Sequence, residues 1–313
     1  MGEDQKPSQP AKPADCVLCG CCLEGCPLLA ATGREELSPR AKALLAGPSK
    51  FKAANMDGGL PEADVAALTG LCLACGRCEK LCPQGVKVPA LMAALRARHP
   101  GFTQWLWKQW ITRLGPFWSL AARGAALTPE AFVPAQFSLA LKGLKGLRPG
   151  AGLAPWLTIT TFPTQAYAEK YGQRPVTLFD GCVGQGPRAV WAKTARQLLQ
   201  GLGANVVEAR FSCCGSTLGV AGLPEEQAQA RRGNIKAWRE AGRPLIATYC
   251  ATCRKGLADY ADCGLFADVD EEKSWASSVT PLSALLAGAT AKIQRGAPSI
   301  VGYHRPCHAD AAD

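Results

Sequence analysis

A cysteine motif that occurs twice near the N-terminus restricts most strongly what this chain can fold into. The spacing C-x2-C-x2-C-x3-C, followed by proline, runs from Cys16 to Pro27 and again from Cys72 to Pro83. In this pattern the first three cysteines lie on a tight loop around one cubane, and the fourth ligates the other cluster. Zinc ribbons use separate C-x2-C pairs, so the spacing fits zinc poorly. The repeat therefore predicts two [4Fe-4S] clusters.

The spacing rule assigns the cluster ligands crosswise between the two motifs. We expect the first cluster to be held by Cys16, Cys19, Cys22 and Cys82. We expect the second cluster to be held by Cys72, Cys75, Cys78 and Cys26. Gly20 and Gly76 fall inside the loops, where the backbone passes close to inorganic sulfur. Cys21 lies outside the pattern, and we expect it to be a small packed residue.

The remaining cysteines also favour metal binding over disulfides. The chain of 313 residues contains 16 cysteines, while residues 1–15 are polar and Pro-rich and carry no secretory signal. We expect that segment to be a disordered tail. The expected location is therefore the reducing cytoplasm, where clustered cysteines act as metal ligands.

Between the two motifs and after the second one the sequence predicts helices. Start and stop signals indicate helices over residues 40–46, 61–70 and 89–98. The two motifs stand farther apart than in a compact bacterial ferredoxin. Residues 16–99 thus resemble the α-helical ferredoxin type that forms one lobe of larger dehydrogenases.

Residues 100–170 form a basic, Trp-rich connector. Eight Lys or Arg and one acid lie between Arg96 and Arg148, a local excess of +7 within a net charge of +10. No apolar run is long enough to span a membrane. The connector could lie at a lipid surface, or its helices could pack on the protein or on a partner subunit. We expect no nucleic-acid binding, because the segment holds no recognition motif.

From Pro175 onward the pattern changes to α/β. We expect strands at 176–179, 205–208, 245–248 and 300–303, and helices at 188–201 and 224–242. Strands that alternate with helices predict a parallel sheet over residues 171–298. The fold class is therefore α+β multidomain, with an α-helical two-cluster ferredoxin domain before an α/β domain.

Cysteines follow the predicted strands. Cys182 comes after the first strand, a cysteine pair after the second, and a C-x-x-C pair after the third. The carboxyl ends of parallel strands meet at one rim of the sheet. Five thiols could therefore meet there and hold a metal centre: Cys182, Cys213, Cys214, Cys250 and Cys253.

This cysteine order resembles the cysteine-rich CCG domain. With two ferredoxin motifs in front, the chain is similar to glycolate oxidase iron–sulfur subunits, lactate-utilisation iron–sulfur proteins and the D subunit of heterodisulfide reductase. The stretch Ser38-Pro39-Arg40 also resembles that group. In heterodisulfide reductases a complete set of five such cysteines binds a non-cubane [4Fe-4S] cluster, so the resemblance implies a third cluster. Zinc is the alternative, because thiolates suit it as well.

The CCG family carries two such halves, and residues 299–313 resemble the opening of the second. We expect a domain that is truncated there, either as a fragment or as a protein that works with one site. His304, Cys307 and His308 could bind metal, but we expect the histidines to act outside the coordination sphere. Cys263 lies outside the motif and is expected to be structural.

The resemblance implies electron transfer between partners. The sequence holds no G-x-G-x-x-G fingerprint after an early strand, so hydride chemistry is expected on another subunit. We expect relay from a flavin-dependent glycolate- or lactate-type dehydrogenase to a quinone or disulfide, with the chain cytoplasmic and peripheral on the inner membrane face. The alternative is a catalytic subunit of a heterodisulfide-reductase-like complex. A third hypothesis is an iron–sulfur sensor that binds nucleic acid.

Overall fold

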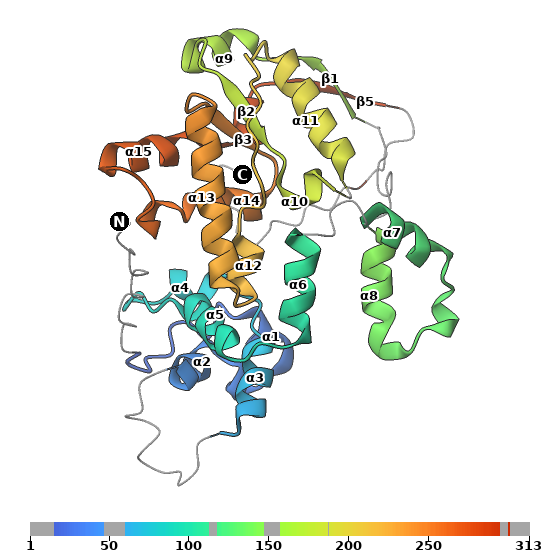
Figure 1. Cartoon of the computed structure of the whole chain (residues 1–313), viewed down its shortest axis with the longest axis vertical. Coiled ribbons are helices and arrows are strands. Elements are labelled where there is room, and N and C mark those ends of the chain that lie inside the picture. The colour runs from blue at the N-terminus through green and yellow to red at the C-terminus, as the bar shows by residue number, and fades with distance from the viewer. Residues whose placement is uncertain are drawn as a thin grey trace, which may run out of the picture. The chain divides into compact units, whose positions relative to one another are not determined.

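The chain divides into two compact units. The computed structural model describes residues 16–46, 60–112, 118–146, 157–186, 188–294 and 300. The first unit joins the chain up to Trp107 with Thr217–Glu226, and the second holds the rest (Figure 1). A segment from the C-terminal half of the sequence therefore belongs to the N-terminal unit.

The first unit is helical. Its helices are α1 (Pro27–Thr32), α2 (Pro39–Ala46), α3 (Glu62–Gly70), α4 (Arg77–Lys80) and α5 (Val88–Arg98), with a 3-10 turn at Glu35–Leu37. The three helices expected between and after the motifs correspond to α2, α3 and α5, each within one residue at both ends. Pro27 opens α1 directly after Cys26, because proline suits the first turn of a helix.

A small apolar core holds these helices together. It consists of Ala43, Val86, Val88, Met92 and Leu95, and Cys16, Cys72, Cys78 and Cys82 pack against it. The thiol-bearing loops therefore rest on the packed faces of α2 and α5.

Thr217–Glu226 approaches the backbone of α5 closely. Gly222 has φ +80°, and a Cβ atom there would lie 2.6 Å from the Ala97 nitrogen. Only glycine permits this approach. Helix α12 (Ser216–Val220) overlaps the start of this segment.

Among the described residues, the stretch 100–146 of the connector contains three helices. They are α6 (Phe102–Thr112), α7 (Trp118–Leu127) and α8 (Ala135–Gly146), with a 3-10 turn at Glu130–Phe132. Lys142 and Lys145 both form ion pairs with Glu130, at 3.8 Å and 3.5 Å. The only acid of the basic segment thus offsets part of its charge. Within the described part of the chain, no helix combines the length and apolar character needed to cross a membrane.

A parallel sheet organises the second unit. Its strands β2 (Val176–Phe179), β3 (Leu245–Thr248) and β4 (Val279–Pro281) stand in the order β2-β3-β4, and both pairs are parallel. A separate antiparallel pair joins β1 (Leu157–Thr161) to β5 (Thr290–Ile293). The remaining helices are α9 (Thr164–Tyr171), α10 (Gly181–Gly184), α11 (Ala189–Gly201), α13 (Pro224–Glu240), α14 (Ala251–Ala258), α15 (Val269–Ser278) and α16 (Leu282–Leu285), with a 3-10 turn at Ala261–Cys263.

Successive residues of the central strands enter two different cores. Leu245 and Ala247 of β3 pack in one cluster, while Ile246 packs in the other. This alternation places the two cores on opposite faces of the sheet. Cys213, Cys214 and Cys253 lie in the same core as Ile246. The cysteine-rich site is thus built into one face of the sheet.

The predicted strand at 205–208 is wrong as a full strand. Only one parallel bridge forms, between Val206 and Val176, and two backbone hydrogen bonds of 2.8 Å support it. Asn205 and Glu208 are exposed, so the segment lies at the sheet edge and leaves it after one pairing. The predicted strand at 300–303 lies outside the described residues except for Ile300.

Candidate metal centres

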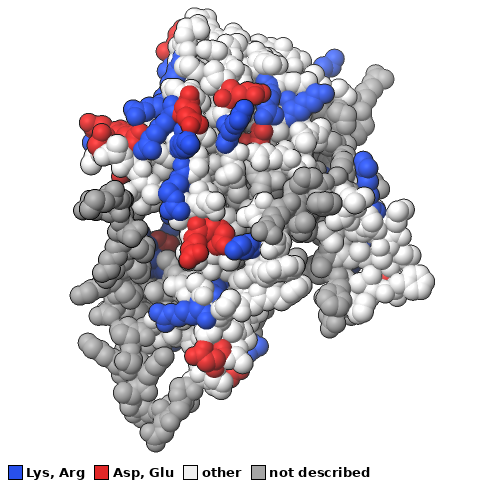
Figure 2. Space-filling view, in the orientation of Figure 1, with Lys and Arg blue, Asp and Glu red and all other residues white. Residues whose placement is uncertain are grey.

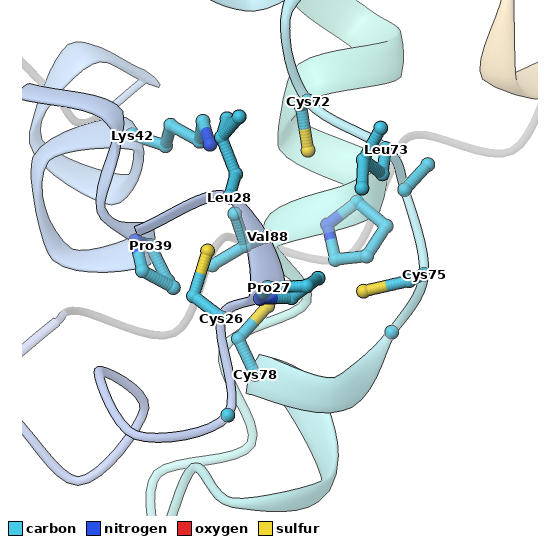
Figure 3. A pocket seen from close by; sticks show the side chains of 14 residues that line it. Cys26, Pro27, Leu28, Pro39, Lys42, Cys72, Leu73, Cys75, Cys78 and Val88 are labelled. Atoms are coloured by element: carbon cyan, nitrogen blue, oxygen red, sulfur yellow. The ribbon is translucent and has the colours of Figure 1, made fainter. Parts of the chain in front are cut away.

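One cavity in the first unit is lined by thiols from both motifs. Its cysteines are Cys26, Cys72, Cys75 and Cys78. Figure 3 shows the sulfur atoms of Cys72 and Cys75 directed into the space that Cys26 also lines. Leu28, Leu73 and Val88 form apolar walls. The cavity brings together the four residues grouped above as ligands of the second cluster.

A second cavity in this unit has the complementary thiols. Cys16, Cys19, Cys22 and Cys82 line it. The backbone N–H of Val86 donates a 3.3 Å hydrogen bond to the sulfur of Cys82. The fourth cysteine of each motif therefore lies with the first three of the other.

The two loops repeat an unusual backbone conformation. Gly20 and Gly76 have φ of 85° and 75°, and the non-glycine residues Leu18 and Ala74, at equivalent motif positions, have φ of 60° and 50°. Left-handed non-glycine residues are uncommon and persist where the surroundings impose them. The same sequence spacing thus produces the same local fold twice.

Two cations on α2 lie beside different cavities. Lys42 lines the cavity of Cys72 and Cys26, and Arg40 lines that of Cys16 and Cys82. Residues two apart on a helix point to nearly opposite sides. From the sequence, Arg40 was identified only within the stretch that resembles the iron–sulfur subunits, and Lys42 was not identified.

A buried arginine holds the loop that leads to the second cavity. Arg96 is 8% exposed, and its guanidinium donates to the carbonyl oxygens of Thr69, Gly70 and Cys72, at 2.6 to 3.2 Å. It therefore caps the C-terminus of α3, where carbonyls lack helical partners. Burial lowers the pKa of Arg96, and the neighbouring Cys72 opposes that shift. Sequence alone gave no signal for this residue.

Burial also affects the free thiols. It raises the pKa of Cys78 to about 12, with a further contribution from the charge of Cys72. Without a metal this thiol is neutral at physiological pH. A bound cation would supply the charge that ionises it.

The structure brings the five cysteines of the second unit together. Cys182 lies in α10 after β2, Cys213 and Cys214 lie in the loop before α12, and Cys250 and Cys253 lie at the start of α14 after β3. Hydrogen bonds between thiols connect Cys182 to Cys213, Cys213 to Cys214, Cys214 to Cys253, and Cys253 to Cys250. The carboxyl ends of β2 and β3 and the loop before α12 thus place all five in one chain of contacts.

These contacts divide the thiols into two protonation classes. Hydrogen bonds from Cys213 and Cys253 lower the pKa of Cys182 and Cys214, and the bond from Cys253 lowers that of Cys250 to about 6. The same bonds raise the pKa of Cys213 and Cys253. A metal bound at these thiols would displace the protons that they carry.

Two glycines leave room for the sulfur atoms. A Cβ atom at Gly181 would lie 3.0 Å from the sulfur of Cys253, and one at Gly256 would lie 3.2 Å from that of Cys214 and would clash with Ser216. Side chains at either position would displace a thiol.

A buried polar network supports the cysteine pair. The Asn234 amide donates to the carbonyl oxygen of Cys213 at 2.9 Å, and the Tyr260 hydroxyl donates to that of Cys214 at 3.0 Å. Asn234 also bonds Tyr260 at 2.9 Å and accepts from the Ser212 backbone at 2.8 Å. Both side chains are fully buried. The sequence did not single them out, since neither belongs to a motif.

The donor sets fit thiophilic metal centres. Of the described residues that line the two cavities of the first unit, none is His, Asp or Glu. Thiolates select iron–sulfur clusters or zinc. Among the described ranges, no three Cys, His, Asp or Glu side chains surround a position for a single metal ion.

The other cysteines have different environments. Cys21 is exposed, so the expectation that it packs inside is wrong. Hydrogen bonds from the backbone N–H of Cys21 and then from its thiol lower the pKa of Cys19. Cys263 packs against the core that holds Cys213 and Cys253, in agreement with a structural role. His304, Cys307 and His308 lie outside the described residues.

Comparison with known proteins bears on both units. Residues 13–86 match the 4Fe-4S dicluster domain, and residues 176–258 match the cysteine-rich domain named CCG. Over 84 residues the chain is 39% identical to the probable glycolate oxidase iron-sulfur subunit of Bacillus subtilis (strain 168). That match covers 26% of this chain and 18% of the relative. No solved structure matches the chain significantly.

These matches confirm the resemblance that the cysteine patterns indicated. The first model ends soon after Cys82, and the second contains all five cysteines that meet in the second unit. The chain therefore contains a 4Fe-4S dicluster domain followed by a CCG cysteine-rich domain and is related to a glycolate oxidase iron-sulfur subunit.

Proposed function

We propose that this chain is the electron-transfer subunit of an oxidoreductase and carries two [4Fe-4S] clusters. The observation that carries the proposal is the crosswise grouping of eight cysteines in two cavities. Cys16, Cys19, Cys22 and Cys82 would hold one cluster, and Cys72, Cys75, Cys78 and Cys26 the other. When bound, such clusters supply reversible one-electron transfer.

The protein's own residues prepare these sites. Leu28, Leu73 and Val88 give the cavity of Cys72 apolar walls, and burial of a cluster is one of the factors that set its potential. The Val86 N–H stabilises negative charge on the sulfur of Cys82.

We further propose a third metal centre at Cys182, Cys213, Cys214, Cys250 and Cys253. The chain of thiol contacts supports it, and the buried bonds from Asn234 and Tyr260 fix the backbone of the cysteine pair. The five-thiol set favours an iron–sulfur centre, and zinc is the competing occupant.

The partners follow from the relative's name. A glycolate oxidase iron-sulfur subunit implies a flavoprotein that oxidises a small 2-hydroxy acid. We propose that this chain accepts electrons from such a subunit and delivers them to a quinone or a disulfide. The connector helices are the proposed contact with that partner or with a membrane surface. Glu130 offsets the charges of Lys142 and Lys145, so exposed apolar side chains such as Leu127 would contribute most of the contact.

One observation favours a second function. All five CCG thiols are present and in contact, as a disulfide-cleaving centre of the heterodisulfide-reductase type would require. The chemically reduced full chain should then consume a mixed disulfide without a flavoprotein. A relay subunit would leave the disulfide intact until an acceptor subunit is added.

Metal analysis of the full chain tests the main proposal. After anaerobic reconstitution we expect about eight irons in the first unit and about four more at the five-cysteine site. Cys26→Ser and Cys82→Ser should each impair a different cluster. Retention of both clusters in Cys82→Ser would refute the crosswise grouping. One zinc and no additional iron would refute a cluster at the third site.

A further inference from the structure

Lys42 is a buried cation beside the thiols of one cavity. It is 2% exposed, and it lines the same cavity as Cys26, Cys72 and Cys78. Figure 3 shows its side chain extending toward Leu28, on the rim of the space that the cysteines surround. Its ammonium donates a 2.5 Å hydrogen bond to the carbonyl oxygen of Leu37.

No carboxylate in the described residues pairs with Lys42. Ion pairs in the described part of the first unit include those of Arg34, Arg40 and His99. A buried ammonium with only a carbonyl partner has lost most of its hydration and is costly without a counter-charge. The four thiolates and the cluster that they would hold supply such a counter-charge.

Arg40 provides the internal comparison. It lines the cavity of Cys16 and Cys82, but its side chain is 36% exposed and pairs with Glu35 at 2.9 Å. Solvent and the carboxylate both screen its charge. The two cavities thus differ in electrostatics although their thiol sets are equivalent.

A buried positive charge favours the reduced state of a nearby cluster, because reduction adds one negative charge. We propose that Lys42 holds the cluster of Cys72, Cys75, Cys78 and Cys26 at a higher reduction potential than the cluster of Cys16, Cys19, Cys22 and Cys82. The first electron to enter the domain therefore resides on the second cluster. This inference rests on the proposed two-cluster function, and it adds the order in which the two clusters are reduced.

Two other groups also affect the difference in reduction potential between the two clusters. Arg96 adds a second buried cation next to Cys72 and acts in the same direction. The Val86 N–H bonded to Cys82 raises the potential of the first cluster and acts in the opposite direction. A neutral dipole interacts more weakly than a full charge at low dielectric, so the cations determine the order.

The experiment is a reductive titration of the reconstituted full chain, followed by EPR spectroscopy. Cys19→Ser and Cys75→Ser assign each signal to a cluster. In the wild type we expect the first electron equivalent to produce the signal of the second cluster. Lys42→Met should lower the occupancy ratio of second to first cluster about tenfold, which is about 59 mV for a one-electron couple. Lys42→Arg should preserve the ratio.

Arg40→Met is the matched control, and it should change the ratio far less. The metal-free protein gives an independent readout with the opposite sign. Without a cluster the buried ammonium has no anion, so Lys42→Met should raise the melting temperature of the apo-protein. This measurement remains decisive if Lys42→Met fails to assemble the second cluster.

Either of two results would overturn the inference: a first electron on the first cluster in the wild type, or an unchanged ratio in Lys42→Met. If Lys42→Met fails to assemble the second cluster, an unchanged apo melting temperature overturns the inference instead. All of these results are compatible with a wild type that assembles two clusters, so they leave the proposed function intact. A chain that binds only about four irons or fewer fails the proposed function instead.

Discussion

The Arg96 guanidinium donates a 2.7 Å hydrogen bond to the carbonyl oxygen of Val220, six residues beyond Cys214 in the sequence. The same guanidinium bonds the carbonyl oxygen of Cys72 at 2.6 Å. One side chain thus connects a ligand loop of the dicluster domain to the segment that follows the CCG cysteine pair.

Loss of Arg96 should release that segment. In Arg96→Gln we expect faster amide exchange across Thr217–Glu226 and a fall of about 1.5–3 kcal/mol in unfolding free energy, because buried carbonyls lose a charged donor. Hydrogen-exchange mass spectrometry and thermal denaturation measure both effects. Arg98→Gln, an exposed change on the same helix, serves as the control. Identical exchange in the two variants would contradict the role of Arg96.

Gly256→Ala should damage the five-cysteine site selectively. The added methyl would clash with Ser216 and press on the sulfur of Cys214, so we expect loss of the metal at this site while the two dicluster sites keep theirs. Metal analysis with EPR of the full chain checks this. Gly233→Ala adds the same methyl in open space on α13 and should keep full metal content, with a gain of about 0.5–1 kcal/mol in helix stability. Equal metal content in the two variants would remove the steric argument.

The Cys250 thiol should react as a thiolate near neutral pH. The hydrogen bond from Cys253 lowers its pKa from 9.0 to about 6, so alkylation of the apo-protein should rise through pH about 6. The thiolate contributes stability that is fully present above pH about 9 and is lost as the pH falls through about 6. Site-resolved mass spectrometry gives the profile, and urea-unfolded protein should titrate near 9. Cys253→Ala should move the midpoint upward, and an unmoved midpoint would exclude Cys253 as the cause.

Low pH should destabilise the second unit because Glu271 becomes protonated. Hydrogen bonds from Arg239 and the Ala267 backbone lower the pKa of Glu271 from 4.5 to about 2. Its ionised form therefore contributes stability that is present above pH about 4.5 and is lost as the pH falls toward 2. Denaturant midpoints should drop over that range in the wild type but not in Glu271→Gln, which should be less stable at neutral pH. Asp270→Asn, at an exposed acid, should follow the wild type.

Sequence could predict those elements whose signal is local. The buried runs 176–179 and 245–248 agree residue for residue with β2 and β3, because strands buried on both faces read as continuous apolar segments. The helices around Ala43 and Met92 were found from proline and glycine signals. The order of cysteines after strands led to a five-thiol set, and the structure places those thiols in contact.

Other elements depend on long-range contacts and were missed. β4 has three residues and ends in proline, which argues against a strand in any local reading. The pairing of β1 with β5 joins Leu157 to Ile293 across most of the second unit. Lys42 and Arg96 look like ordinary surface cations in sequence, and only tertiary packing buries them. Asn205–Glu208 was predicted too long because β-propensity does not report an edge.

The distribution of the five thiols over separate loops limits when the metal centre proposed for them could be loaded. Cys182 follows β2, the cysteine pair lies in the loop before α12, and the C-x-x-C follows β3; β2 joins β3 only when the chain beyond Leu245 has been synthesised. No shorter nascent chain presents the complete donor set. The proposed centre would therefore mature late, after the sheet has assembled, and a cell that lacks its metal should leave the second unit, not only its cofactor, exposed to proteolysis.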